Sequence, residues 1–308
     1  MKALIVGAAG FAGNYLIEEL AKSGYETIGV DMMASAKITF IDIRDINALK
    51  KIISDVRPDC IFNLAGFTSV AESWRNVQEC FFLNVIGSIN VLEAVRETGA
   101  DSKIILIGSS EQYGNRVRES GGSISESVIL NPISPYAISK RTQEDIGKVY
   151  SAVHGMNIYM TRTFNYIGIG QKLGFVISDF AEGIVKIERG LNQVLRVGNT
   201  MTFRCFTDVR DIVRAYRLIM EQGIAGRIYN VGSEKSYSIK EILNIMINLS
   251  YVNNIVVEED ADKFRVYDTP YMQCDYTLLN QDTGWKPEIS IEKTISDILQ
   301  YYRNIYDR

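Results

Sequence analysis

Short runs rich in isoleucine and valine alternate with amphipathic stretches over the first 165 residues, and this alternation constrains the fold more than any other feature. The strand-like runs occupy residues 2–8, 25–31, 37–43, 59–66, 103–110 and 157–165, and the helical stretches occupy 11–24, 46–58, 76–99 and 136–155. Parallel sheets that carry helices on both faces show this pattern. The sequence therefore predicts an α/β fold built on a doubly wound parallel sheet.

The pattern becomes less regular after about residue 170. Helical stretches are expected at 174–190, 208–223, 238–250 and 289–306, and short strands at 193–198 and 228–232. We interpret residues 1–170 as the sheet domain and residues 171–308 as a smaller α/β lobe that binds a substrate. The two parts can share elements.

Charge and residue usage exclude several classes of function. The net charge of −4 does not suit a nucleic-acid partner, and no apolar run approaches the ~20 residues that span a membrane. The four cysteines, Cys60, Cys80, Cys205 and Cys274, are far apart and predict neither a metal site nor a disulfide framework. Reduced thiols in the cytoplasm are expected. His154 is the only histidine, so chemistry that needs a histidine base is not expected.

Three glycines lie where the first predicted strand meets the first predicted helix. Gly7 allows a tight turn, Gly10 allows a pyrophosphate to approach the backbone, and Gly13 allows the helix to pack closely on the strand. The helix that follows, from Phe11 and Ala12 onward, offers free N–H groups to phosphates. These residues predict a Rossmann-type dinucleotide site. A secretory signal is not expected, because the apolar run continues directly into an amphipathic helix.

Two aspartates follow the next strands. Asp31 ends the second predicted strand, 18 residues after Gly13, where a carboxylate can accept hydrogen bonds from both adenosine ribose hydroxyls and repel a 2′-phosphate. NAD is therefore the expected cofactor, and Lys37 leaves NADP open. Asp42, with Ile43, is placed at the end of the third predicted strand to meet the adenine. The alternative role for both aspartates is to cap a turn or helix.

A tyrosine and a lysine four residues apart indicate the chemistry. Tyr136 and Lys140 share one face of a predicted helix. An ammonium beside a phenol stabilises the phenolate, so the phenol can exchange a proton with a hydroxyl while a nicotinamide exchanges hydride at the same carbon. Ser109 or Ser110, at the end of the fifth predicted strand, can donate a hydrogen bond to the reacting oxygen.

Together these motifs make the chain resemble the extended short-chain dehydrogenases/reductases that act on nucleotide sugars, the NAD-dependent epimerase/dehydratase family. The resemblance covers almost the whole chain. It includes NLAG at 63–66, NVIGSINVLEA at 84–94, SSEQYG at 109–114, NPISPYAISK at 131–140, RTFNYIG at 162–168, FTDVRD at 206–211, YNVG at 229–232 and GWKP at 284–287.

The resemblance implies a role for each matching residue. Ser109, Tyr136 and Lys140 match the catalytic triad, and Lys140 also binds the nicotinamide ribose. The loop of Leu64, Ala65 and Gly66 matches a cofactor-binding segment. Residues that match the contacts to the substrate phosphates are Asn165, Arg204 and, with a weaker local match, Arg265. Cys205 departs from the family pattern, because an aspartate is usual there. Helices 77–98 and 136–154 match the helices through which the family forms homodimers.

The reaction itself is left with alternatives. The reductases of GDP-4-keto-6-deoxymannose match the segment after Asn165 best, which favours hydride transfer to C4 of a nucleotide-diphospho-4-keto-6-deoxyhexose. Glu111 could instead act as a base at C5, which would give a 4,6-dehydratase, or an enzyme that also epimerises C5. A third possibility is an NAD-binding sensor or scaffold without chemistry. The nucleotide base and the sugar are not specified by any motif.

Overall fold

Seven parallel strands form one sheet in a computed structural model that describes residues 1–119, 123–264 and 271–307. Their order across the sheet is β11-β6-β5-β4-β1-β2-β3, and every neighbouring pair is parallel. The strands are β1 (Lys2–Val6), β2 (Glu26–Asp31), β3 (Ile38–Phe40), β4 (Cys60–Asn63), β5 (Lys103–Ser109), β6 (Ile158–Thr163) and β11 (Ile228–Val231). The predicted α/β fold is confirmed. The strand order reverses between β1 and β4, which is where such sheets bind ligands.

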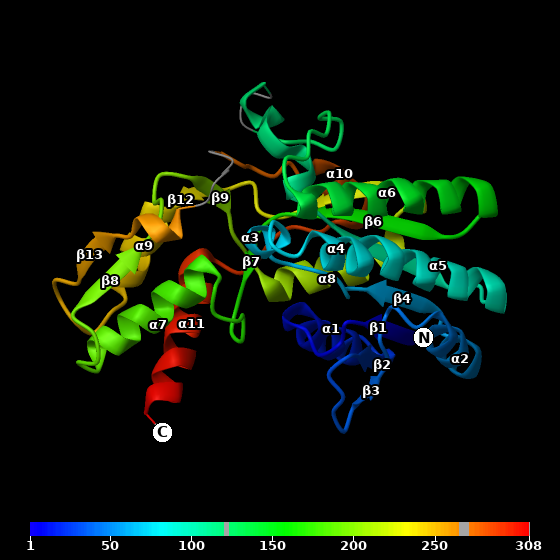
Figure 1. The fold of residues 1–308 in the computed structure, drawn as a ribbon, viewed down its shortest axis with the longest axis horizontal. Coiled ribbons are helices and arrows are strands. Elements are labelled where there is room, and N and C mark those ends of the chain that lie inside the picture. Colours follow the sequence, from blue (N-terminus) through cyan, green and yellow to red (C-terminus); the bar gives the residue numbers. More distant parts are fainter. Residues whose placement is uncertain (120–122, 265–270, 308) are drawn as a thin grey trace.

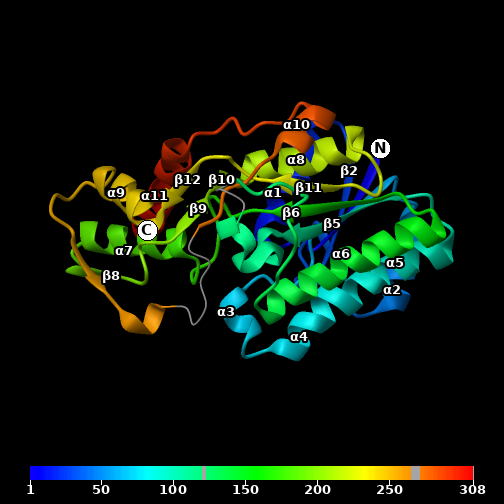
Figure 2. The same ribbon diagram turned by 90° about the horizontal axis from the view of Figure 1, so that it is seen from above.

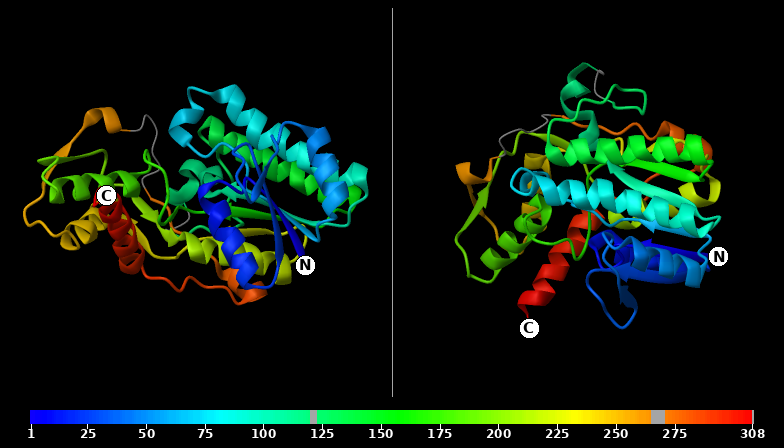
Figure 3. Two further views of the ribbon diagram at one scale, coloured as in Figure 1. Left: turned by 90° about the horizontal axis from the view of Figure 1, so that it is seen from below. Right: turned by 45° about the vertical axis from the view of Figure 1, so that its right-hand side comes forward.

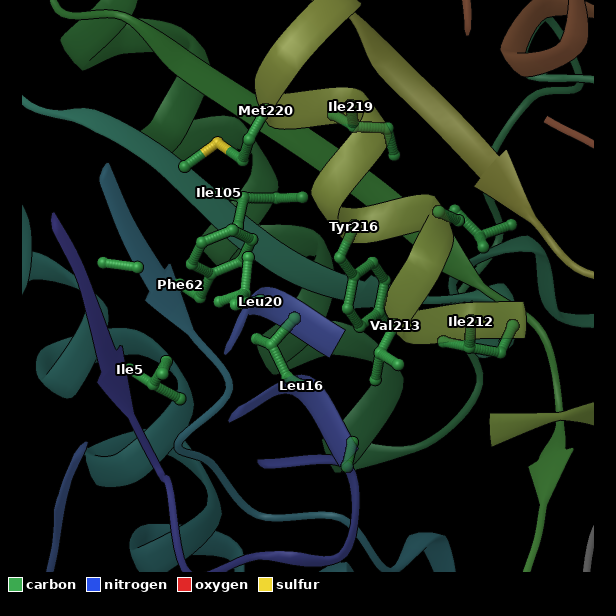
Figure 4. Packing of buried hydrophobic residues seen from close by; sticks show 14 of the residues in the cluster. Ile5, Leu16, Leu20, Phe62, Ile105, Ile212, Val213, Tyr216, Ile219 and Met220 are labelled. Carbon is green, nitrogen blue, oxygen red and sulfur yellow. The ribbon is translucent and has the colours of Figure 1, made fainter. Parts of the chain in front are cut away.

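Helices cover both faces of this sheet (Figure 2). On one face lie α2 (Ile46–Val56), α4 (Val77–Phe81), α5 (Gly87–Thr98) and α6 (Pro135–His154). On the other lie α1 (Phe11–Lys22), α8 (Val209–Gln222) and α10 (Thr277–Thr283). Figure 4 shows α1 and α8 meeting the sheet, with Leu16, Leu20 and Tyr216 packed against Ile5 and Phe62. Because both faces are covered, the central strands β1, β4 and β6 are buried along nearly their whole length, as their apolar composition requires. The edge strand β3 is mostly exposed.

The sheet takes elements from both predicted parts of the chain. The strand β11 and the helix α8 belong to the stretch assigned to the second lobe, yet β11 pairs with β6 and α8 packs on α1. Trp285 packs in the same helical layer as α8, and its indole Nε1 donates to the carbonyl of Asp211 at the start of α8. The positions of β11 and α8 follow from pairing at the edge of the sheet and from burial of their apolar side chains. Their place late in the sequence does not decide it.

The bounds of several predicted elements differ from the structure, and two of the differences bear on the site. The third strand ends at Phe40, three residues before the predicted end at residue 43, so Asp42 lies in the turn that leads to α2. The long helix predicted over 76–99 is interrupted by a π-helical turn, Phe82–Ile86, between α4 and α5. Such a turn inserts an extra residue into the helical ladder and is frequent at functional sites.

The remaining elements form a smaller lobe beside the sheet (Figure 1). Its helices are α7 (Val176–Glu188), α9 (Ile239–Asn248) and α11 (Ile291–Tyr306), which share one apolar core with β8 (Val194–Val197). Short strands lie between this lobe and the sheet domain: β7 (Tyr166–Ile167), β9 (Phe203–Cys205), β10 (Thr207–Asp208) and β12 (Ser236–Ser238). The strand β13 (Val256–Glu259) instead pairs with β8 inside the lobe. A short helix, α3 (Val70–Ser73), precedes α4.

Two of the exclusions can be examined in the described part of the chain. None of its helices is long and apolar enough to cross a membrane. All four cysteines are buried and free, and no group of three or more His, Cys, Asp or Glu side chains there could hold a metal ion.

Candidate active site

The glycine-rich loop after β1 has the tight geometry that its sequence predicts. Gly7 adopts φ +89°, and a Cβ there would lie 2.5 Å from the backbone nitrogen of Ala65. A Cβ on Gly13 would lie 2.5 Å from the carbonyl oxygens of Gly7 and Ala8, so the helix can approach the loop only with glycine at this position. A Cβ on Gly10, in contrast, would meet only the Gly7 carbonyl, at 3.2 Å.

The start of α1 suits a pyrophosphate. Gly10 is its N-cap, no side chain in the described residues caps it, and its first turn carries no acidic residue. The N–H groups of the first turn, at Phe11 and Ala12, have no acceptor inside the helix and carry the positive end of its dipole. A dinucleotide phosphate would satisfy both the hydrogen bonds and the charge, so these residues fit the implied cofactor.

Asp31 lies at the carboxyl end of β2, as the spacing predicts. One carboxylate oxygen accepts from the backbone N–H of Ala9, at 3.0 Å, and the other accepts from the N–H of Met33, at 3.0 Å. These bonds hold the carboxylate beside the glycine-rich loop, where the ribose of a dinucleotide would lie. They also show that the side chain caps its own turn. Lys37 is exposed on the following segment.

Asp42 and Ile43, which were predicted to meet the adenine, have their side chains engaged within the protein. The carboxylate of Asp42 is held by the guanidinium of Arg44, with Nε and Nη2 at 2.9 and 2.6 Å, and these hydrogen bonds lower the pKa of Asp42. The side chain of Ile43 is buried against Gly87 of α5. An adenine contact from Ile43 would therefore have to come from its backbone.

The loop after β4 is anchored by a residue of the π-helical turn that the sequence did not single out. The side-chain oxygen of Asn84 accepts from the N–H of Phe67, at 2.8 Å, and its amide donates to the hydroxyl of Ser139 on α6, at 2.8 Å. A Cβ on Gly66 would lie 2.5 Å from the same Asn84 oxygen and 3.5 Å from Nζ of Lys140. Asn84 thus joins the predicted cofactor loop to the helix that carries Tyr136 and Lys140.

The catalytic candidates converge at the carboxyl end of β5. The helix α6 begins at Pro135, capped by the Ser134 hydroxyl, which accepts from the N–H of Ala137. This start brings Tyr136 into hydrogen-bonding contact with Ser109, the last residue of β5. One turn further along, Nζ of Lys140 donates to the carbonyl of Ile107 at 2.8 Å. The three residues predicted from the sequence therefore share one site.

Burial affects the two titratable members of this group in opposite directions. It raises the pKa of Tyr136 well above its usual value, although the hydrogen bond from Ser109 opposes the rise. The lowering of this pKa that was expected from the Lys140 ammonium is therefore not found, because desolvation of the buried phenol dominates. The phenol is consequently protonated at neutral pH and can act as a proton donor. Burial lowers the pKa of Lys140 to about 8, because an ammonium is poorly solvated there.

A buried polar network lies beneath Ser109 and was not predicted. The side-chain oxygen of Gln112 accepts from the N–H of Ser109 at 2.9 Å, and its amide donates to Glu144 on α6 at 2.7 Å. Glu144 also forms a two-bond ion pair with Arg162 on β6, with both N–O distances 2.8 Å. Burial would raise the pKa of Glu144, but the hydrogen bonds and charge of Arg162 and Lys148 outweigh it and hold that pKa at about 2.

Three of the remaining predicted residues, Glu111, Ser110 and Asn165, follow β5 and β6 at the same end of the sheet. The N–H of Glu111 donates to the hydroxyl of Ser109 at 3.2 Å, and the charge of Glu111 contributes to the raised pKa of Tyr136. Ser110 is buried, and Asn165 is exposed at the end of β6. Arg204 is buried on β9, where Nη1 donates to the carbonyl of Phe203. Arg265 lies outside the described residues.

An aromatic pair links the glycine-rich loop to the segment after β6. The rings of Phe11 and Tyr166 are stacked, with centroids 5.8 Å apart and an interplanar angle of 10°. Tyr166 also contributes to the raised pKa of Tyr136. Its position next to Asn165 in a recognised motif is the only sequence signal that could have singled it out.

Comparison with known proteins identifies the family of the chain. A family model described as GDP-mannose 4,6 dehydratase matches residues 4–298. A GDP-6-deoxy-D-mannose reductase of Pseudomonas aeruginosa is 33% identical over 243 residues, which make up 79% of each chain. GDP-mannose 4,6 dehydratase 2 of Arabidopsis thaliana is 28% identical over 319 residues, or 95% of this chain and 84% of the relative.

A solved structure of RMD from Pseudomonas aeruginosa complexed with NADPH superimposes with a TM-score of 0.90. It is 29% identical and covers 99% of this chain and 100% of its own. On the match over 295 of the 308 residues, counted from 4 to 298, the chain belongs to the GDP-mannose 4,6-dehydratase family of extended short-chain dehydrogenases/reductases, NAD(P)-dependent enzymes that act on nucleotide sugars.

Proposed function

We propose that this enzyme reduces a nucleotide-diphospho-4-keto-6-deoxyhexose at C4. The observation that carries the proposal is the contact between Tyr136 and Ser109 with Lys140 one helical turn away, at the ligand-binding edge of the sheet. The 33% identical relative is named as a reductase of this type, which supports it further.

Each residue has a distinct part in this reaction. The nicotinamide supplies hydride to the C4 carbon when it is bound. The hydroxyl of Ser109 donates a hydrogen bond to the C4 oxygen. Tyr136 transfers its phenolic proton to that oxygen as negative charge develops on it, so the carbonyl becomes a hydroxyl and the phenol becomes a phenolate. The ammonium of Lys140 stabilises the phenolate and holds the nicotinamide ribose.

A second candidate, 4,6-dehydration, rests on the position of Glu111. Its carboxylate is close enough to Tyr136 to act on the pKa of the phenol. A base at that point could remove the C5 proton of a 4-keto intermediate, and water would then leave from C6. The dehydratase relatives match a larger share of this chain than the reductase does, at lower identity.

For the cofactor we propose NAD, with NADP as the alternative. The support is the carboxylate of Asp31, which the backbone of Ala9 and Met33 holds in place. A fixed negative charge there opposes a 2′-phosphate. The solved relative with a TM-score of 0.90 is complexed with NADPH, which is the reason to test both cofactors.

We also propose that the enzyme forms a homodimer in the cytoplasm through α4, α5 and α6. These helices run side by side on the outer face of the sheet domain (Figure 3, right). They expose large apolar side chains, between 42 and 69% accessible: Val77, Phe82, Ile86, Ile138, Val149 and Val153. Large apolar side chains exposed together on one face of a protein mark an interaction surface, which supports the proposal.

The proposed reaction is tested by absorbance at 340 nm. The enzyme is mixed with NADH or NADPH and with enzymatically prepared GDP-, UDP-, dTDP- and CDP-4-keto-6-deoxysugars. Loss of absorbance in proportion to one of these substrates supports the reductase and identifies its nucleotide. No loss with any of them refutes it.

The same enzyme is then incubated with the parent nucleotide sugars and its products are weighed by mass spectrometry. Loss of one water without net use of cofactor assigns the dehydratase. Binding of cofactor without either reaction would leave a non-catalytic binding role.

A further inference from the structure

Gln143 is a buried side chain that the proposed reaction does not use. It lies on α6 three residues after Lys140 and is 1% exposed. Its side-chain oxygen accepts a hydrogen bond from Nζ of Lys140 at 3.0 Å. The same ammonium donates to the carbonyl of Ile107 at 2.8 Å. Two of its three N–H groups are thus directed to neutral oxygens, and one is left for a ligand.

The ammonium of Lys140 fixes the orientation of the Gln143 amide, that is, which side holds its oxygen and which its nitrogen. An ammonium has only donors, so the amide must present its oxygen to Lys140. The amide nitrogen, Nε2, then finds no hydrogen-bond partner in residues 1–119, 123–264 or 271–307, although it is buried. An unpaired buried donor is unfavourable and calls for an explanation. The explanation consistent with this geometry is that the contact to Lys140 outweighs the unpaired N–H groups.

The groups that face Lys140 from other elements are nearly all neutral. They are the Ile107 carbonyl on β5 and Gly66 after β4, where a Cβ would lie 3.5 Å from Nζ of Lys140. The thiol of Cys80 on α4 is the one titratable group of the described residues that acts on the pKa of Lys140. On α6 itself, the phenol of Tyr136 is protonated, and the carboxylate of Glu144 is paired with Arg162 and Lys148.

The charge on Lys140 therefore depends on neutral acceptors. We propose that Gln143 is a positioning residue that keeps the side chain of Lys140 charged and in place for the nicotinamide ribose. Because the amide of Gln143 is neutral, it does this without an ion pair, so the positive charge of Lys140 remains available to stabilise the phenolate of Tyr136. A glutamate has the same shape but would neutralise that charge. A methionine fills similar space but offers no comparable acceptor. This inference rests on the role of Lys140 in the proposed function.

The test measures the titration of Lys140 in the unliganded enzyme. Lysines are labelled with carbon-13 at Cε, the Lys140 signal is assigned with Lys140→Arg, and its midpoint is followed by NMR as pH rises. Burial places the wild-type midpoint near the lowered pKa of about 8. We expect Gln143→Met to lower the midpoint by about 1 pH unit and Gln143→Glu to raise it by about 1 pH unit or more.

Thr142→Ala, on the same turn of α6, is the matched control and should leave the midpoint unchanged. A purely structural role for Gln143 would lower stability in the variants without moving the midpoint, and equal midpoints in the Met and Glu variants overturn the proposal. If Gln143→Met does not fold, the near-isosteric Gln143→Glu still decides by the direction of its shift. The pH above which NADH binding weakens, read by its fluorescence, should move with the NMR midpoint.

Neither measurement needs a sugar substrate. A shifted midpoint in an enzyme that reduces none of the substrates would support the role of Gln143 and refute only the proposed reaction. An unshifted midpoint in an active reductase would support the proposed reaction and refute the role of Gln143.

Discussion

Replacing Glu144 by glutamine should destabilise the enzyme strongly, because it removes one charge from a buried ion pair. Glu144 and Arg162 are 3% and 4% exposed and are joined by two hydrogen bonds of 2.8 Å. Removing one partner leaves the other charge buried without compensation, which costs about 3–5 kcal/mol. Glutamine keeps the size of the side chain and one acceptor, and Arg162 retains its bonds to Tyr113 and to the Glu126 carbonyl. We therefore expect a loss of about 3 kcal/mol, at the lower end of that range.

The effect should depend on pH in a definite direction. The pKa of Glu144 is about 2 in the folded protein against an ordinary value of 4.5. Because folding lowers this pKa, the carboxylate contributes stability above about pH 4.5, and this contribution is lost as pH falls through about 2. The difference in stability between the wild type and Glu144→Gln should therefore be full at pH 7 and should shrink below pH 4.5.

Urea unfolding followed by circular dichroism measures these differences. Arg162→Met should cost a similar amount, and the double variant should cost about 2 kcal/mol less than the sum of the two, since neither charge remains unpaired. Lys148→Met is the control, because its ammonium is 39% exposed and its ion pair with Glu144 should be worth less than about 1 kcal/mol. A loss below about 1 kcal/mol in Glu144→Gln, with additive effects in the double variant, would refute the reasoning.

Four further predictions concern the site and the surface. Tyr136→Phe should lower kcat by about 10²–10⁴-fold while cofactor binding is kept, since only the proton donor is lost; a parallel loss of NADH affinity, measured by fluorescence, would argue against this role. Asp31→Ala should weaken binding of NADH more than that of NADPH in calorimetric titrations, and equal losses would remove the argument for NAD. Gly13→Ala should lower the melting temperature because its Cβ would lie 2.5 Å from two carbonyl oxygens, whereas Gly10→Ala, with one contact at 3.2 Å, should mainly weaken dinucleotide binding; similar melting temperatures for both would contradict the close packing at Gly13. Phe82→Asp, at a side chain that is 50% exposed, should convert a dimer to a monomer in analytical ultracentrifugation, with the exposed Tyr251→Asp on the other lobe as control; a wild-type monomer would exclude the proposed interface.

Local pattern was sufficient for the first six strands of the sheet and for the residues attached directly to them. Alternation of apolar and amphipathic stretches predicts parallel strands, and the carboxyl ends of parallel strands meet at one edge. Gly7 after β1, Asp31 at the end of β2 and Ser109 at the end of β5 could therefore be assigned to one site. Tyr136 and Lys140 followed from helical spacing, because four residues bring two side chains to one face.

Contacts between distant segments were not accessible in this way. The ring of Phe11 meets Tyr166 across 155 residues, and Gln112, Glu144 and Arg162 come from three different elements. Nothing in the local sequence around these residues states that they will meet, because a hydrogen bond between elements depends on how the helices pack on the sheet. The π-helical turn that presents Asn84 depends on packing as well, since a regular helix of the same sequence satisfies local propensity equally.

What the sequence alone determined is the class of fold, the glycine-rich loop after β1 and the helix face shared by Tyr136 and Lys140, because each depends on spacing within one element or one turn. Only the tertiary structure decided that β11 completes the sheet and that α8 covers it. It also decided that Asp42 pairs with Arg44 and that Lys140 donates its hydrogen bonds to neutral oxygens. The physical reason is that burial and pairing are properties of the folded chain: which charges are desolvated, and what faces them, is set by surfaces brought together from remote parts of the sequence.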